Sequence, residues 1–80
     1  MKVKTIQFGI IKEILGKASA DFELKEGSAV EDFKHLLEKE YPDLQSLHYL
    51  KFAVNDEYVD DNFILKENDE VALIPPVAGG

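Results

Sequence analysis

Hydrophobic and polar residues are spaced in a way that predicts a strand and then a short helix at the start of the chain. Residues 2–8 are rich in β formers and are expected to form a strand, which Gly9 ends. Residues 10–15 then carry apolar side chains at the spacing of one helical face, at Ile11, Ile14 and Leu15. Gly16 follows them and is a typical residue for ending a helix.

A second strand and the main helix are predicted next. Residues 20–24 alternate acidic and apolar side chains, which is typical of a half-buried strand. A helix is expected over about residues 29–40, because apolar residues recur at helical spacing, at Val30, Phe33 and Leu37. Ser28 and Glu31 fit a capping box at its start. Pro42 is expected to stop the helix, since the residue before a proline disfavours helical dihedrals.

The second half of the chain predicts short strands joined by turns. Residues 43–50 are expected to form a loop that can include one helical turn. Three segments are then expected to be strands: residues 51–55, 58–59 and 70–74. Residues 63–65 fit a bridge or a turn, and Asn68 is a good turn former before the last strand. Pro75 ends that strand, because proline cannot donate to a β-ladder.

This order of elements predicts an α+β domain with one main helix packed on a mixed sheet. The pattern does not fix the strand order, but a hairpin, a crossover helix and a returning last strand suit the β-grasp arrangement. We expect residues 1–75 to form the β-grasp domain and residues 76–80 to form a flexible C-terminal tail.

The composition and charge of the chain exclude several classes of function. The chain has 80 residues, which is the size of one small domain, and a formal net charge of −7, with nine Lys and no Arg. That charge argues against nucleic acid as a ligand and favours basic proteins as partners, although solubility alone explains most of the carboxylates. With no apolar run near the roughly 20 residues of a membrane span, we expect a soluble, cytoplasmic protein. The absence of cysteine excludes disulfides, thiolate metal sites and a thiol nucleophile on the chain.

The candidate for chemistry is the last segment of the sequence, whose residues are all small or rigid: Pro75, Pro76, Val77, Ala78, Gly79 and Gly80. The prolines stiffen the exit from the sheet, whereas the two glycines lack Cβ and can enter a narrow active site. Extended, six residues reach up to about 20 Å. Such a tail can place the Gly80 carboxylate deep inside a partner protein while the domain stays outside.

A carboxylate must be activated before it can react, most simply as an acyl-adenylate made with ATP by another enzyme. An incoming sulfur would then give a C-terminal thiocarboxylate, which would let a chain without cysteine carry sulfur. A thioester or an isopeptide bond to a lysine of another protein are alternative fates of the same activated end. The remaining alternative is a frayed tail with no function.

The chain resembles the small, sulfur-carrying subunits of molybdopterin synthase (molybdopterin converting factor subunit 1), which belong to the ubiquitin-like β-grasp superfamily. Residues 8–16 look like the aromatic-x-x-x-(Arg/Lys)-Glu-x-x-Gly segment of that family, and residues 53–55 match the end of its central strand. Residues 69–80 look like its D-E-V-A-x-x-P-P-V-x-G-G terminus and are the most specific part. One departure is Asn68, which stands where the family commonly has glycine, but asparagine tolerates a positive φ.

This resemblance implies a chemical role for Gly80. An adenylyltransferase that resembles ubiquitin-activating enzymes would use ATP to adenylate Gly80, and a sulfur donor protein would then allow conversion to a thiocarboxylate. The carrier would dock on the large subunit of molybdopterin synthase and donate sulfur to cyclic pyranopterin monophosphate. The catalytic residues are expected in that large subunit, within a heterotetramer of two small and two large subunits. No bound cofactor or metal is expected on this chain.

The resemblance also suggests docking residues and leaves rival functions open. Phe8, Tyr58 and Ile74 align with partner-facing apolar positions of the family, although ordinary core is the alternative for each. His35 and His48 are expected to be exposed, because neither has a metal-ligating neighbour at a useful spacing. The rival functions are a sulfur carrier of the thiamine pathway, a ubiquitin-like protein modifier, and a binding module with an inert tail.

Overall fold

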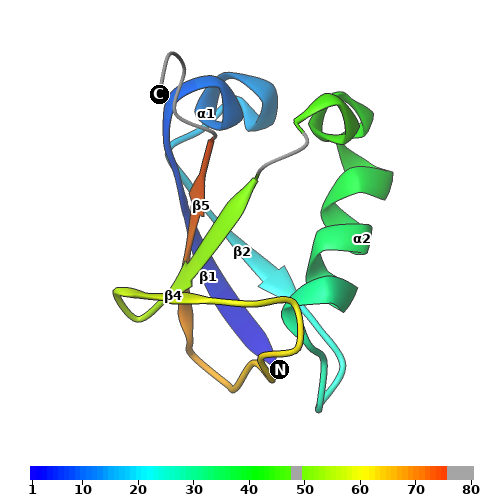
Figure 1. Cartoon of the computed structure of the whole chain (residues 1–80), viewed down its shortest axis with the longest axis vertical. Coiled ribbons are helices and arrows are strands. Elements are labelled where there is room, and N and C mark those ends of the chain that lie inside the picture. The colour runs from blue at the N-terminus through cyan, green and yellow to red at the C-terminus, as the bar shows by residue number, and fades with distance from the viewer. Residues whose placement is uncertain (48–49, 76–80) are drawn as a thin grey trace.

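The computed structural model describes residues 1–47 and 50–75 of the chain. The elements follow one another in the order β1, α1, β2, α2, η1, β3, β4 and β5 (Figure 1). The helical elements are the α-helices Gly9–Leu15 (α1) and Val30–Glu40 (α2) and the 3-10 helix Pro42–Ser46 (η1). The strands are Lys2–Gln7 (β1), Ser19–Glu23 (β2), Lys51–Val54 (β3), Glu57–Val59 (β4) and Glu70–Ile74 (β5).

Within the described ranges, five strands form one mixed sheet in the order β2-β1-β5-β3-β4. The pair β1 and β5 is parallel, and the other neighbouring pairs are antiparallel. The long helix α2 lies along one side of the sheet, and α1 lies near the end where β5 finishes (Figure 1). The predicted α+β architecture with a β-grasp fold is therefore confirmed, as is the last strand at residues 70–74.

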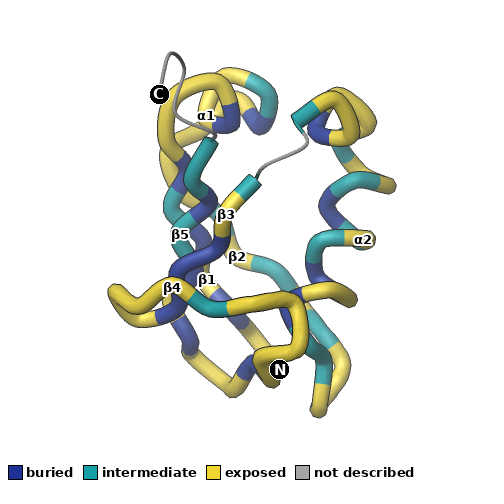
Figure 2. Tube along the Cα trace, viewed as in Figure 1, coloured by how far each residue is buried: buried dark blue, intermediate teal, exposed yellow. Residues whose placement is uncertain are grey.

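The hydrophobic core fills the layer between α2 and the sheet (Figure 2). Phe33 on α2 is fully buried at its centre. Its ring meets Phe22 of β2 and Phe52 of β3 edge to face, with centroid distances of 5.3 and 6.3 Å. Such contacts add to the stabilisation that comes from burying apolar area. One aromatic side chain thus joins the helix to two strands that are not neighbours in the sheet.

The start of α2 differs from the prediction. The N-cap is Ala29, and the Asp32 carboxylate accepts from its backbone N–H at 2.9 Å, so the predicted capping box at Ser28 and Glu31 is wrong. The Ser28 hydroxyl instead donates to the Lys25 carbonyl at 2.7 Å. The cause is a long-range contact, because Ala29 forms a β-bridge with Ile64 that keeps the backbone extended for one more residue.

A polar cluster joins the β3–β4 turn to the start of β5. The Asp69 side chain, in a residue only 8% exposed, accepts from Asn55 Nδ2 at 3.0 Å and from the Lys66 backbone N–H at 2.8 Å. Asn55 Oδ1 in turn accepts from the Glu70 backbone N–H at 3.1 Å. Asn55 and Asn68 both have positive φ, of 50° and 69°, which asparagine tolerates well. The cluster therefore holds two tight turns and the beginning of the last strand together.

Replacing Asp69 with alanine is expected to lower the free energy of unfolding by about 2–3 kcal/mol, because it leaves two N–H donors of Asn55 and Lys66 without their acceptor. Thermal denaturation and urea unfolding measure the loss. The exposed Glu67, whose carboxylate accepts from the Lys2 backbone N–H, supplies the control Glu67→Ala, with an expected loss below about 1 kcal/mol. Asn55→Ala combined with Asp69→Ala should be clearly less than additive. Full additivity would show that the cluster does not act as one unit.

Candidate functional site

The sheet has a second face, opposite α2, that carries a row of apolar residues. Val3 and Gln7 are buried on the α2 side of β1, and successive side chains of a strand point to opposite faces, so Ile6 lies on the open side. The register places Ile6 beside Ala72, Ala72 beside Ala53, and Ala53 beside Tyr58. An apolar row therefore crosses four strands on the face opposite α2, which none of the described helices covers.

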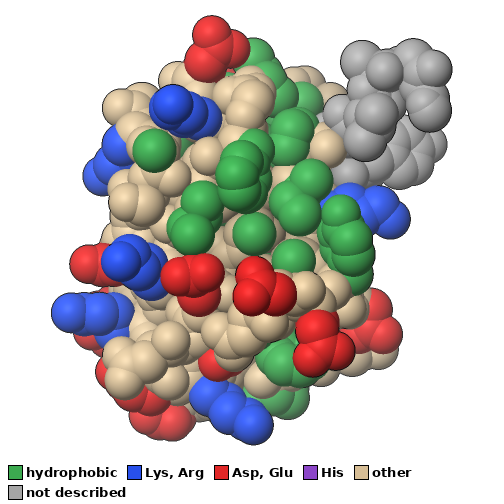
Figure 3. Space-filling view, turned by 90° about the vertical axis from the view of Figure 1, so that its left-hand side faces the viewer, with side chains coloured by type: hydrophobic (Ala, Val, Ile, Leu, Met, Phe, Trp, Pro, Cys, Tyr) green, Lys and Arg blue, Asp and Glu red, His purple; other side chains and the backbone are tan. Residues whose placement is uncertain are grey.

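Two further apolar residues extend this row toward the end of β5. Ile74 is the last residue of β5 and shares the parity of Ala72. Phe8 keeps an extended backbone (φ −125°, ψ 154°) and so continues the alternation of β1. We call the whole set the open-face patch, which consists of Ile6, Phe8, Ala53, Tyr58, Ala72 and Ile74. Figure 3 shows apolar side chains gathered across the middle of this face.

The structure brings the three docking candidates together on the open-face patch. Tyr58 is 69% exposed and Phe8 is 49% exposed, whereas Ile74 is partly buried. Core packing therefore does not account for Tyr58 or Phe8. Large exposed apolar areas of this kind mark interaction sites more often than free surface. Whether these residues bind a partner remains a prediction.

Sequence reasoning missed Ile6, Ala53 and Ala72, which form the middle of the patch. The reason is that β1 buries polar residues on its core side. Gln7 is 2% exposed there, and its Nε2 donates to the Lys17 carbonyl at 3.0 Å. If the polar Gln7 had been assumed to be buried, the alternation of side chains along β1 would have placed Ile6 on the face of the sheet opposite to that of Val3.

Charged residues border the patch. Lys4 of β1 lies in register with Asp21 of β2 on one side and Glu70 of β5 on the other. Lys51 of β3 lies beside Ile74, at the end from which the tail departs. In Figure 3 acidic side chains border the lower side of the apolar area. An apolar centre with a charged rim is the usual composition of a protein–protein interface.

The root of the tail packs against the start of α1. Gly9 has a φ of +55°, and a Cβ added there would lie 3.2 Å from Cγ of Pro75, so the two residues are in close approach. Pro75 is partly buried and continues directly from the patch residue Ile74. The remaining predicted tail residues lie outside the described residues: Pro76, Val77, Ala78, Gly79 and the reactive candidate Gly80.

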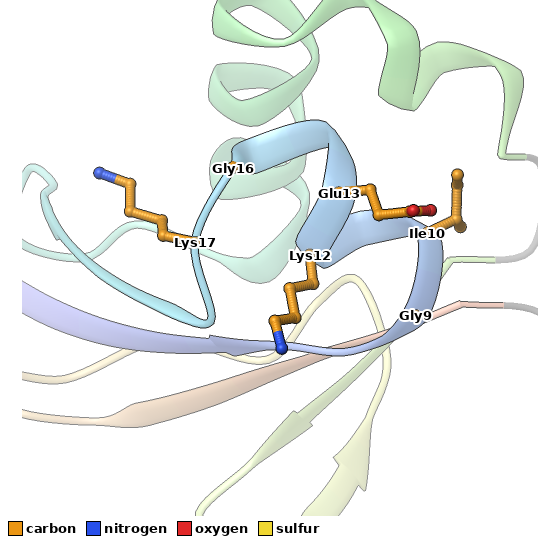
Figure 4. Close-up of a pocket in the computed structure, with 6 residues that line it drawn as sticks. All are labelled: Gly9, Ile10, Lys12, Glu13, Gly16 and Lys17. Carbon is orange, nitrogen blue, oxygen red and sulfur yellow. The ribbon is translucent and has the colours of Figure 1, made fainter.

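A shallow hollow on α1 lies beside this root, lined by Gly9, Ile10, Lys12, Glu13, Gly16 and Lys17. Figure 4 shows that its charged groups diverge: Lys12 extends toward β1, Lys17 points away from the helix, and Glu13 lies on the same side as Ile10. Charged groups that point apart cannot act together on one substrate atom. The hollow therefore has the character of a surface contact rather than of an active site.

The described part of the chain holds no group of three or more metal-ligating side chains. His35 is exposed on α2, as expected, whereas His48 lies outside the described residues. In residues 1–47 and 50–75 no helix is both long and apolar enough to cross a membrane. The described region therefore presents an apolar surface, the open-face patch, that ends at Pro75.

Known proteins of one family are similar to this chain along nearly its full length. The family model described as ThiS family matches residues 6–80. The molybdopterin synthase sulfur carrier subunit of Chlamydomonas reinhardtii is 39% identical over 83 residues, with 100% of both chains covered. That of Dictyostelium discoideum is 38% identical, with 96% of this chain and 94% of the relative covered.

One solved structure with a partner is also similar. It is the protein–protein complex of subunits 1 and 2 of molybdopterin-converting factor from Helicobacter pylori. The matched chain is 29% identical, all of both chains is covered, and the TM-score is 0.72. The family match over nearly the full length and the identity to these relatives lead to one conclusion: the chain belongs to the ThiS family of small carrier-type proteins that includes the molybdopterin synthase sulfur carrier subunits.

Proposed function

We propose that this chain is the sulfur-carrier subunit of a molybdopterin synthase, with Gly80 as the residue that carries the sulfur. The observation that carries the proposal is the open-face patch, which leads through Ile74 and Pro75 directly into the Gly-Gly tail. The names of the relatives, which align along the whole chain, support it. A docking face joined to a reactive end is what a carrier needs, because its chemistry takes place in other proteins.

The chemistry takes place at the Gly80 carboxylate. An adenylyltransferase joins this carboxylate to the AMP part of ATP and releases pyrophosphate. Sulfur at the sulfide level, supplied by a sulfur donor protein, then attacks the acyl carbon, displaces AMP and leaves a thiocarboxylate. The thiocarboxylate gives its sulfur to cyclic pyranopterin monophosphate, and water returns Gly80 to a carboxylate. ATP is thus a co-substrate of the activating enzyme, and this chain is a sulfur donor rather than a catalyst.

The large subunit of the synthase is the partner that receives the tail once it carries sulfur, in a heterotetramer of two small and two large subunits. The solved Helicobacter complex of a similar subunit 1 with subunit 2 supports this pairing. The open-face patch supplies the apolar contact, and the tail from Pro76 onward enters the large subunit. The protein would act in the cytoplasm, where ATP is available for activation.

Deleting Gly80 is expected to abolish sulfur transfer while leaving the fold intact. The shortened tail still ends in a carboxylate, that of Gly79, but this group falls one residue short of the reacting position, and a misplacement of even about 1 Å can cost about 100-fold in rate. Molybdopterin formation with the large subunit, the activating enzyme, ATP and a sulfur donor measures the effect. Unchanged molybdopterin formation by the shortened chain would contradict the role of Gly80.

Replacing Tyr58 with alanine is expected to weaken binding of the large subunit by about 10-fold or more, because buried tyrosines are frequent anchors of interfaces. Isothermal titration with the large subunit measures the dissociation constant. Phe63→Ala is the matched control, since Phe63 is an aromatic residue that is 36% exposed but lies outside the open-face patch. Equal losses for both variants would argue against the patch as the docking site.

Assays of thiamine formation and of protein conjugation distinguish two other carrier functions. A chain that rescues thiamine formation but not molybdopterin formation would be a carrier of the thiamine pathway. A chain that forms covalent conjugates of higher mass with cell proteins, and no molybdopterin, would be a ubiquitin-like modifier.

A further inference from the structure

We propose that Ile10, on the outer side of α1, is a docking residue that packs on an apolar lip of the large subunit, at the mouth of the channel that receives the tail. The inference rests on the proposed function and adds a contact outside the open sheet face. Three observations carry it: the exposure of Ile10, its position beside the tail root, and the short reach of the tail.

The exposure of Ile10 is unusual for this helix. In α1, Ile11 is fully buried, Leu15 is 7% exposed and Ile14 is partly buried, whereas Ile10 is 45% exposed. Ile10 lies outside the apolar face of α1, which the spacing of the apolar residues along the helix defines. Single exposed apolar residues are common on proteins and need no function by themselves. The surroundings of Ile10 are what set it apart.

Ile10 lies next to the root of the tail. Its neighbour Gly9 is in close approach to Pro75, as the 3.2 Å separation between Pro75 Cγ and a Cβ added at Gly9 shows. On the other side of Gly9, Phe8 is 49% exposed and belongs to the open-face patch. Apolar side chains gather across the middle of this face of the sheet (Figure 3). The apolar surface around the tail root therefore includes both strand and helix residues.

The length of the tail determines which residues of the domain the partner must contact in the complex. From Pro75 to Gly80 an extended chain reaches no more than about 20 Å. A partner that binds Gly80 at close to this depth therefore brings its surface up to Pro75. Residues that touch Pro75 then become part of the interface. Because Gly9 is such a residue, the start of α1 is expected to meet the partner at the channel mouth.

The side chains of α1 indicate the chemistry of the opposing surface. Figure 4 shows Ile10 and Glu13 extending to the same side of α1, as expected for residues three apart on a helix. The matching lip on the large subunit is therefore apolar opposite Ile10 and carries a lysine or arginine opposite Glu13. Lys12 and Lys17 extend in other directions and are not part of this contact.

Ile64 provides a matched control. It is 51% exposed, slightly more than Ile10, and it is bridged to Ala29 just before α2 rather than placed at the tail root. If removing any exposed isoleucine weakened binding, Ile64→Ala and Ile10→Ala would raise the dissociation constant equally. If the position beside the tail root is what matters, only Ile10→Ala should raise it.

The test is the dissociation constant of the full chain for the large subunit, measured by titration calorimetry. Ile10→Ala is expected to raise this constant about 10-fold, since it removes three carbons of a side chain that the complex buries. Ile10→Leu should stay within about threefold of the wild type, and Ile64→Ala within about twofold. Thermal denaturation checks that each variant folds, and Ile10→Gln replaces Ile10→Ala if the alanine variant is less stable.

Wild-type affinity of folded Ile10→Ala and Ile10→Gln would overturn the inference, as would an equal loss in Ile64→Ala. An effect on the activating enzyme but not on the large subunit would overturn it too. These results differ from failure of the proposed function, in which the wild-type chain itself would neither bind the large subunit nor support molybdopterin formation.

Discussion

The arrangement of the molecule depends on the parallel pairing of β1 with β5 at the middle of the sheet. Residues 4–7 pair with residues 70–73, so the first and last strands run side by side in the same direction. Both strands therefore end at the same edge, where β1 continues into α1 and β5 continues into the tail. This pairing explains why Gly9 and Pro75 meet, although 65 residues separate them in the chain. The tail follows β5, a strand that is paired on both sides, with β1 and with β3.

The two faces of the sheet differ in how far their apolar residues are buried. The face toward α2 holds the core around Phe33, which leaves that side fully occupied. The other face keeps Tyr58 and Phe8 in contact with solvent, at a cost in exposed apolar area that a small domain can tolerate only to a limited extent. The open-face patch ends at the tail root, at Ile74 and Pro75. In the proposed function, a partner that covers the patch therefore also receives the tail.

Much of this organisation was accessible from the sequence, because local patterns determine it. The helical spacing of Phe33 and Leu37 predicted α2, and the prolines after Ile74 marked the end of β5. Contacts between distant segments were not accessible. The bridge between Ala29 and Ile64 shifted the start of α2 away from the predicted cap at Ser28. The open face was only partly predicted, because the buried Gln7 concealed the alternation that places Ile6 outside.

The central claim is that the domain exists to present a carboxylate that becomes a sulfur carrier. The most direct test is the intact mass of the wild-type chain after incubation with ATP, the activating enzyme and a sulfur donor. The account predicts a mass gain equal to the replacement of one oxygen by one sulfur, located by fragmentation at Gly80. An unchanged mass would contradict this claim, if a known carrier gains sulfur from its own activating enzyme under the same conditions.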